Sequence, residues 1–261
     1  MAKPRVLVLR APGTNCDIET AFAFDMAGAE AVSIHVQQLI ERPTLADNFQ
    51  ILCFPGGFSY GDDIAAGRVL ATQLNIHLRD AIERFRSEDR LVLGICNGFQ
   101  IMMRLGIFFE ESSQCPPATL TWNAKGRFED RWVHLKVTSD SSPFLNGIEQ
   151  LFLPMAHAEG RFVVRDEVAS KRMVLQQQIA LRYCQADGAT GDSVLPFPVN
   201  PNGAALNLAG LSDESGRVFG LMPHPERHLF PTHHPFWTRR EEQPEYGEGF
   251  AVFQNAVQFF A

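Results

Sequence analysis

The sequence contains one cysteine in a setting typical of a catalytic nucleophile. Residues 94–98 have the sequence GICNG and overlap the end of the apolar run LVLGI at 91–95. G-x-C-x-G is the thiol counterpart of the G-x-S-x-G nucleophile elbow, a sharp turn between a strand and a helix. The positive end of the helix dipole favours the reactive thiolate. The pattern predicts that Cys96 is a nucleophile, and a buried structural cysteine in a tight turn is the alternative.

A base for this thiol is found much later in the chain, in the segment MPHPER at 222–227. A thiol nucleophile needs a base that is itself oriented by a third group. We expect His224 to carry the proton and Glu226 to orient its ring, against the alternative that His224 is an ordinary loop histidine. The neighbouring histidines lack a cysteine or carboxylate partner at metal-ligand spacing, so we predict no metal site. These are His228, His233 and His234.

A second glycine-rich segment, PGGFSYGD at 55–62, follows another apolar run. Paired glycines let backbone N–H groups point at a developing oxyanion. We therefore expect the N–H groups of Gly57 and Asn97 to form an oxyanion hole. A phosphate-binding loop is the alternative, but neither the G-x-x-x-x-G-K-[ST] nor the G-x-G-x-x-G spacing is present.

The elements that must position these residues alternate between strands and helices in the first part of the chain. We predict strands at 5–10, 30–36, 50–54 and 91–95, a helix capped by Asn15, one long helix through 70–85, and a C-terminal helix at 250–260. Apolar strands alternating with helices predict a parallel sheet with its ligand site at the carboxyl edge. From 132 to 182 only short β-like runs are expected, crossing or extending the sheet.

Composition limits the class of protein. The chain has 261 residues, is 45% hydrophobic, and carries a net charge of −7. This favours one globular domain over residues 1–261 and argues against a basic nucleic-acid footprint. No signal peptide and no apolar run of about 18 residues is seen, so we expect a cytoplasmic protein with no membrane partner. Five cysteines without a C-x-x-C pair indicate reduced thiols.

Five segments together resemble the glutaminase component of phosphoribosylformylglycinamidine synthase, among the class I, triad-type glutamine amidotransferases. They are FPGGFSYGDD, LGICNGFQIM, MAHAEGRF, NPNG and MPHPERH. The similarity extends from residue 5 to the C-terminal helix. It implies an α/β fold of the flavodoxin-like kind: an open, mostly parallel twisted sheet flanked by helices, with additional antiparallel strands.

The resemblance also implies a reaction. Cys96 would form a γ-glutamyl thioester from L-glutamine, with His224 and Glu226 completing the triad. The ammonia would pass to a partner synthase, which uses ATP and magnesium to convert formylglycinamide ribonucleotide to the amidine in de novo purine biosynthesis. This chain itself would need no cofactor. A class I amidotransferase serving another acceptor and a non-catalytic interaction module are the alternatives.

The same comparison implies a glutamine pocket. Phe58 and Gln100 would line it, and the backbone around His157, Ala158 and Glu159 would contact the amino-acid end of the substrate. Ala158 departs from the family, which usually has glycine there, so the added methyl would tighten the pocket or change the backbone angle.

An extension at about 229–247 is a second departure, because short stand-alone subunits generally lack it. Its sequence HPFW at 234–237 resembles the glutaminase domain at the end of large single-chain synthases. The partner could therefore be a separate small-type synthase with a small accessory subunit, or a large-type assembly split into two chains. For Phe236 and Trp237 we favour local packing over a role as interface anchors.

Overall fold

The computed structural model describes residues 3–109, 116–240 and 244–261, so Cys115 and residues 241–243 of the extension lie outside the described residues. The strands are β1 (Arg5–Arg10), β2 (Glu30–His35), β3 (Ile51–Phe54), β4 (Leu91–Ile95), β5 (Ala118–Trp122), β6 (Glu129–Val137), β7 (Gln150–His157), β8 (Glu159–Val164), β9 (Ile179–Tyr183), β10 (Leu208–Ser212) and β11 (Val218–Leu221). The α-helices are α1 (Asp17–Met26), α2 (Val36–Glu41), α3 (Arg68–His77), α4 (Arg79–Ser87), α5 (Asn97–Leu105), α6 (Glu167–Leu175) and α7 (Phe250–Gln258).

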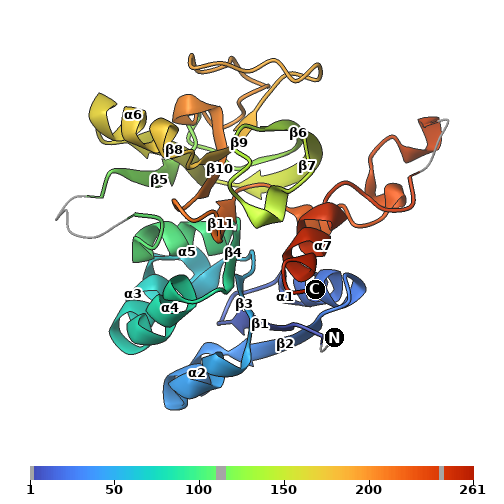
Figure 1. The fold of residues 1–261 in the computed structure, drawn as a ribbon. Helices are drawn as coiled ribbons and strands as arrows, with labels where there is room; N and C mark the ends of the chain where they lie inside the picture. Colours follow the sequence, from blue (N-terminus) through green and yellow to red (C-terminus); the bar gives the residue numbers. More distant parts are fainter. Residues whose placement is uncertain (1–2, 110–115, 241–243) are drawn as a thin grey trace.

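One mixed sheet runs through the molecule in the order β2-β1-β3-β4-β11-β10-β9-β6-β7 (Figure 1). Its first five strands pair in parallel, and the last four extend it by antiparallel pairing. The strands β5 and β8 form a separate small antiparallel sheet. The predicted α/β fold with additional antiparallel strands is confirmed.

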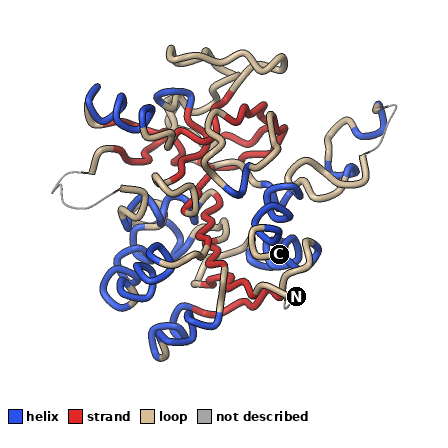
Figure 2. Tube along the Cα trace, in the orientation of Figure 1, coloured by secondary structure: helices blue, strands red, loops and turns tan. Residues whose placement is uncertain are grey.

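Helices cover both faces of the parallel half of the sheet. In Figures 1 and 2, α3, α4 and α5 lie on one side of it, and α1 and α7 lie on the other. Phe24 of α1 and Phe253 of α7 meet edge to face, with ring centroids 5.0 Å apart, and both are fully buried. Because both faces are covered, β3 and β4 consist entirely of buried residues, as their apolar sequences predict.

Three local predictions were wrong. The helix expected through 70–85 is two helices, broken at Leu78, whose φ is −129° while its side chain stays buried. The four-residue apolar spacing continues across this break, so the pattern carries no sign of it. The helix α6 lies in a region where only strands were expected, and its N-cap Asp166 accepts a hydrogen bond from Ala169 N–H. The N-cap of α1 is Cys16 rather than Asn15.

The extension projects beside α7 (Figure 1). Among its described residues, the buried side chains are Leu229 and His234, and the centroid of the His234 ring lies 5.6 Å from that of Trp132. Phe236 and Trp237 remain 54% and 42% exposed. The predicted local packing therefore covers only about half of each of these two side chains.

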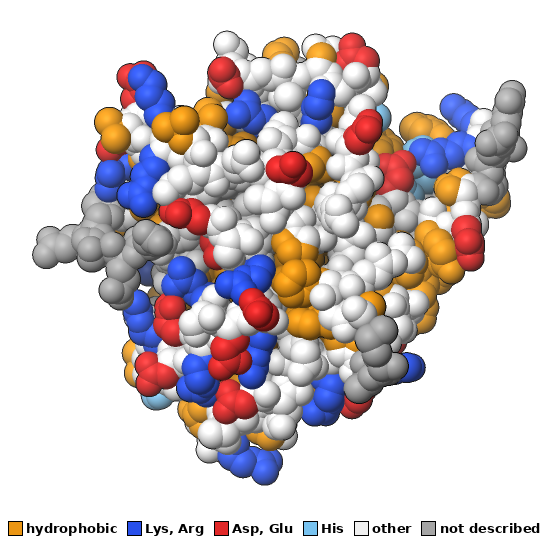
Figure 3. All heavy atoms as spheres, viewed as in Figure 1, with side chains coloured by type: hydrophobic (Ala, Val, Ile, Leu, Met, Phe, Trp, Pro, Cys, Tyr) orange, Lys and Arg blue, Asp and Glu red, His pale blue; other side chains and the backbone are white. Residues whose placement is uncertain are grey.

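The surface carries charges of both signs. On the face drawn in Figure 3, Lys and Arg are interspersed with Asp and Glu, as in the α4 sequence RDAIERFRS. Within the described ranges, no helix combines the length and the apolar character needed to cross a membrane.

Candidate active site

Cys96 occupies a strained turn between β4 and α5. Its φ is 52° and its ψ is −105°, a backbone conformation that costs a non-glycine residue about 1–3 kcal/mol. Two hydrogen bonds hold it: Cys96 N–H donates to Leu221 O at 2.8 Å, and Gln100 N–H donates to Cys96 O at 3.0 Å. The turn places the sulfur at the carboxyl end of a central strand, which is the geometry expected of a nucleophile elbow.

Both glycines of the G-x-C-x-G segment are explained by close packing. A Cβ at Gly98 would lie 1.8 Å from Phe54 O, because the start of α5 touches the backbone of β3. A Cβ at Gly94 would lie 2.2 Å from Met102 Sδ. The helix can follow the strand this tightly only when Gly98 lacks a side chain, whereas a side chain at Gly94 would have to displace that of Met102.

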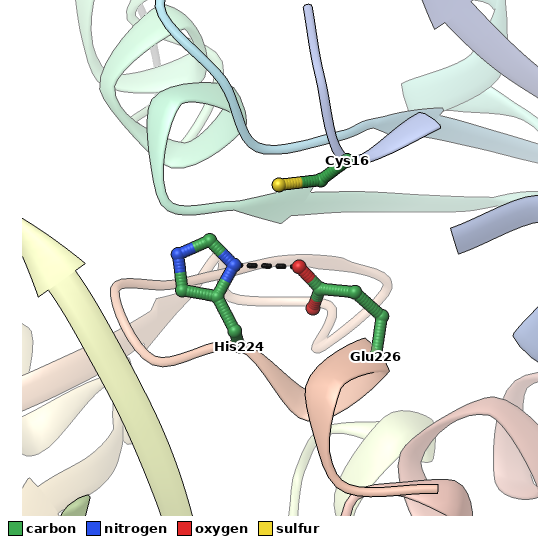
Figure 4. Close-up of side chains that lie close together, drawn as sticks. All are labelled: Cys16, His224 and Glu226. Carbon is green, nitrogen blue, oxygen red and sulfur yellow. Dashed lines mark hydrogen bonds and ion pairs between the residues drawn. The ribbon is translucent and has the colours of Figure 1, made fainter. Parts of the chain in front are cut away.

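His224 and Glu226 form a buried pair just after β11. His224 Nδ1 and Glu226 Oε1 are 2.5 Å apart, and their side chains are 3% and 0% exposed (Figure 4). The contact is even shorter than the usual charge-assisted N–H···O hydrogen bond, which spans about 2.7–2.9 Å. The bond assigns a proton to Nδ1, because a carboxylate can only accept. In the described parts of the chain, His224 Nε2 and Glu226 Oε2 have no hydrogen-bond partner.

The sulfur of Cys96 is electrostatically coupled to this pair. Burial by itself lowers the pKa of His224, but the Glu226 carboxylate and the Cys96 sulfur outweigh it, and the pKa lies well above 6.5. Cys96 Sγ also lies 3.7 Å from Ala156 O at the end of β7. The structure therefore brings Cys96 to a His224–Glu226 pair that lies far from it in the sequence, and the histidine of this pair readily holds a proton.

The two predicted oxyanion donors, the N–H groups of Gly57 and Asn97, lie on two segments that a side-chain hydrogen bond joins. Gly57 has a φ of +150°, and a Cβ there would lie 2.8 Å from Gly13 O. Asn97 is the first residue of α5, so its N–H has no acceptor within the helix. The Asn97 side chain joins the segments, because its Oδ1 accepts from Ser59 N–H at 3.1 Å.

The residues predicted to line the glutamine pocket occupy different environments. Phe58 is 45% exposed. Gln100 is buried, its Oε1 accepts from Asn97 Nδ2 at 2.9 Å, and its Nε2 donates to Glu159 O. The Gln100 amide is thus bonded at both ends and links the elbow to the segment that follows β7.

Asn123, which sequence analysis missed, holds the backbone around His157 and Ala158. Its Nδ2 donates to His157 O at 2.8 Å, its N–H donates to Ala158 O at 2.8 Å, and its Oδ1 lies 3.1 Å from His157 Nδ1. Burial lowers the pKa of His157 to about 3, so this ring is neutral. An isolated asparagine carries no sequence signal for such a role.

Ala158 and Glu159 follow in the same segment. Ala158 is not among the described residues with positive φ, so the family's usual glycine is not needed here for its backbone angle. The Glu159 carboxylate accepts from Ala66 N–H at 3.3 Å and lies 3.7 Å from Arg104 Nη2. Its side chain therefore joins the segment to the region of α3 and α5.

Cys16 is a second residue for which the sequence predicted no role beyond that of a reduced thiol. Its Sγ, a ring nitrogen of His224 and a carboxylate oxygen of Glu226 all lie within 4.8 Å of one another (Figure 4). Such a donor set suits zinc, but the Arg227 guanidinium donates to the sulfur at 3.1 Å and disfavours a second cation. A signal was present, since PGTNC at 12–16 lies in the loop after β1, at the carboxyl edge of the sheet.

Comparisons with known proteins place the chain in a family. Residues 3–260 match the CobB/CobQ-like glutamine amidotransferase domain. A PurQ subunit of phosphoribosylformylglycinamidine synthase from Dehalococcoides mccartyi is 44% identical, over 99% of this chain and 98% of its own. A PurQ subunit from Methanococcus maripaludis is 40% identical, over 98% and 97%. A chain in the structure of PurLQS from Thermotoga maritima superposes with a TM-score of 0.74 at 31% identity, covering both chains completely.

Proposed function

The chain belongs to the family of PurQ subunits of phosphoribosylformylglycinamidine synthase, and we propose on that basis that it hydrolyses L-glutamine through Cys96, His224 and Glu226. It is the glutaminase subunit of that synthase and acts in purine biosynthesis. The observation that supports the triad most directly is the buried 2.5 Å contact between His224 and Glu226, beside the strained elbow of Cys96.

The first half of the reaction forms a thioester. The Cys96 thiolate attacks the side-chain carbonyl carbon of glutamine, and the carbonyl oxygen becomes an oxyanion that Gly57 N–H and Asn97 N–H stabilise. Protonated His224 gives its Nε2 proton to the leaving nitrogen. The C–N bond breaks and ammonia departs, leaving the γ-glutamyl thioester on Cys96.

The second half releases glutamate. Neutral His224 takes a proton from water, and the resulting hydroxide attacks the thioester carbonyl. The C–S bond breaks, so glutamate leaves and Cys96 is again a thiolate. Throughout, Glu226 keeps the Nδ1 proton in place, which leaves Nε2 as the atom that gives and takes the catalytic proton.

The glutamine pocket is proposed to lie between Phe58, Gln100 and the backbone of residues 157–159. In the structure, Cys96, His224 and Glu226 are only 5%, 2% and 1% exposed. We propose that docking to a synthase widens the approach to the sulfur and so prepares the glutaminase for catalysis.

We propose the PurL synthase as the partner, with a small accessory subunit as a third component, because the T. maritima relative comes from a PurLQS structure. ATP and magnesium are assigned to the synthase, since the thiol chemistry requires no cofactor in this chain. A cytoplasmic location is part of the proposal. It is supported by the four free thiols of the described residues, Cys16, Cys53, Cys96 and Cys184.

The test is ammonia release from glutamine by the full complex. Cys96→Ala is expected to abolish it, while synthase activity with added ammonium salt persists, because only the supply of ammonia is lost. Cys184→Ala, at a buried cysteine of no proposed role, is the matched control and should behave as wild type. Unchanged glutamine-dependent activity in Cys96→Ala would falsify the proposal.

A second experiment locates the nucleophile chemically. An electrophilic glutamine mimic is incubated with the complex, and the adduct is identified by mass spectrometry of peptides. We expect it on Cys96. Labelling of Cys16, Cys53, Cys115 or Cys184 instead would refute the assignment.

A further inference from the structure

Cys16 is a second buried thiol beside the His224–Glu226 pair, although its segment is distant from both in the sequence. It is the N-cap of α1, and its side chain lies above the imidazole ring, with the sulfur at the end nearer the ring (Figure 4). The residue is 0% exposed. Its sulfur therefore contacts only protein atoms, and one of its neighbours is the proposed base of the reaction.

The Cys16 sulfur and the His224 imidazole ring both pack against the backbone of Gly56. A Cβ built on Gly56 would lie 2.9 Å from His224 Cε1 and 3.0 Å from Cys16 Sγ. The ring edge and the sulfur thus pack side by side on a residue that precedes the proposed oxyanion donor. Any rotation of the ring changes its contact with the sulfur.

Hydrogen bonds keep Cys16 in place. Its Sγ accepts from Arg227 Nη2 at 3.1 Å and lies 3.1 Å from Asn15 Oδ1, to which the thiol can donate. Its N–H donates to Gly56 O at 3.2 Å, and its carbonyl accepts from Thr20 Oγ1 at 2.6 Å. These hydrogen bonds fix the position of the sulfur relative to the loop that carries Gly56.

We propose that Cys16 is a positioning residue of the glutaminase reaction: its sulfur holds the His224 ring in the orientation that directs Nδ1 to Glu226 and leaves Nε2 for Cys96. The inference rests on the proposed function, because it assigns a role within the same site. It depends on Cys16 Sγ, a ring nitrogen of His224 and a carboxylate oxygen of Glu226, which all lie within 4.8 Å of one another. It also depends on Gly56, against which the sulfur and the ring pack.

A thiol suits this position better than a hydroxyl or a methyl group. It is a weak hydrogen-bond donor, so it fills space without competing with His224 for the Glu226 carboxylate. Burial raises the pKa of Cys16, which keeps the thiol neutral. A serine hydroxyl would offer the carboxylate a stronger donor. Alanine would leave unfilled space beside the His224 ring and the Glu226 carboxylate.

The test compares Cys16→Ala and Cys16→Ser with wild type, using the chain in complex with its synthase, and Cys184→Ala serves as the control. We expect kcat for ammonia release to fall about tenfold or more, equal to about 1.4 kcal/mol in the barrier, with KM changed less than about twofold. The imidazole Nδ1–H, observed by NMR in histidine-labelled protein, should lose its strongly downfield position. The pKa of His224, read from its ring nitrogens, should fall.

A third variant keeps the test decisive if either substitution impairs folding. Arg227→Gln removes the donor that anchors the sulfur, at a side chain that is 40% exposed, and should shift the Nδ1–H resonance in the same direction. Wild-type kcat in both Cys16 variants would overturn the proposal, and so would a loss of kcat with the Nδ1–H resonance unmoved. If wild type itself releases no ammonia in the complex, the proposed function fails instead, and the resonance still reports on Cys16.

Discussion

Replacing Glu226 with glutamine removes a charge from the proposed dyad while keeping the shape of the side chain. In the structure, the Glu226 carboxylate accepts the Nδ1 proton of His224 at 2.5 Å, in a site where the two side chains are 3% and 0% exposed. Glutamine fits the same space. However, it is neutral, and its amide group can turn to donate a proton to Nδ1.

The expected loss follows from the electrostatics of the pair. Two unit charges about 4 Å apart interact by about 4 kcal/mol at an effective dielectric constant of about 20. Since each factor of ten in rate corresponds to about 1.4 kcal/mol, losing the carboxylate should lower kcat about 10³-fold. The change of His224 tautomer in this variant should lower kcat further. An amide N–H facing Nδ1 places the ring proton on Nε2, and that nitrogen can then no longer accept a proton from Cys96 or water.

The assay is glutamine-dependent ammonia release in the complex with the synthase, measured as kcat and KM. Glu226→Asp keeps the charge but shortens the side chain, so its loss should be smaller than that of Glu226→Gln. Glu248→Gln is the control, because Glu248 is a partly buried carboxylate that accepts from Phe152 N–H and pairs with Arg240. It should retain wild-type kcat.

A clear result would refute the reasoning. If Glu226→Gln keeps kcat within about threefold of wild type, the barrier has changed by less than about 1 kcal/mol. The carboxylate would then neither orient His224 nor stabilise its charge. A large loss shared equally by Glu248→Gln would point to a general effect of the substitution on folding.

Two further predictions concern stability. Because Glu226 raises the folded-state pKa of His224 above 6.5, protonated His224 contributes stability that is complete below pH 6.5 and is lost as the pH rises through the raised pKa. The difference in unfolding free energy between wild type and Glu226→Gln, measured by urea titration, should therefore shrink over that pH range. A difference that stays constant with pH would contradict the coupling. Gly98→Ala places a methyl group 1.8 Å from Phe54 O and should lower the free energy of unfolding by about 3 kcal/mol or more in the same experiment. Gly191→Ala is the control, because open space surrounds that position, and its free energy of unfolding should change little. Equal losses in the two variants would exclude the packing explanation.

Short-range patterns predicted much of the fold and of the candidate site. The strands Arg5–Arg10 and Leu91–Ile95 have the predicted bounds, because burial on both faces leaves residues 6–9 and 91–95 continuously apolar. The segments around Cys96 and His224 were recognisable because an elbow and a histidine with its orienting carboxylate are local arrangements. The role of Asn123 could not be predicted in this way, because its hydrogen bond to His157 O joins residues that are far apart in the sequence.

By itself, the sequence determined the residue types of the proposed reaction: a cysteine in a glycine-flanked turn, and a histidine two residues before a glutamate. Tertiary structure alone decided that these groups meet, since β4 and β11 lie side by side in parallel and deliver both loops to one edge of the sheet. It also decided that Cys16, carried by the loop after β1, reaches the same edge. The physical reason is that parallel strands bring their carboxyl ends together whatever their separation along the chain.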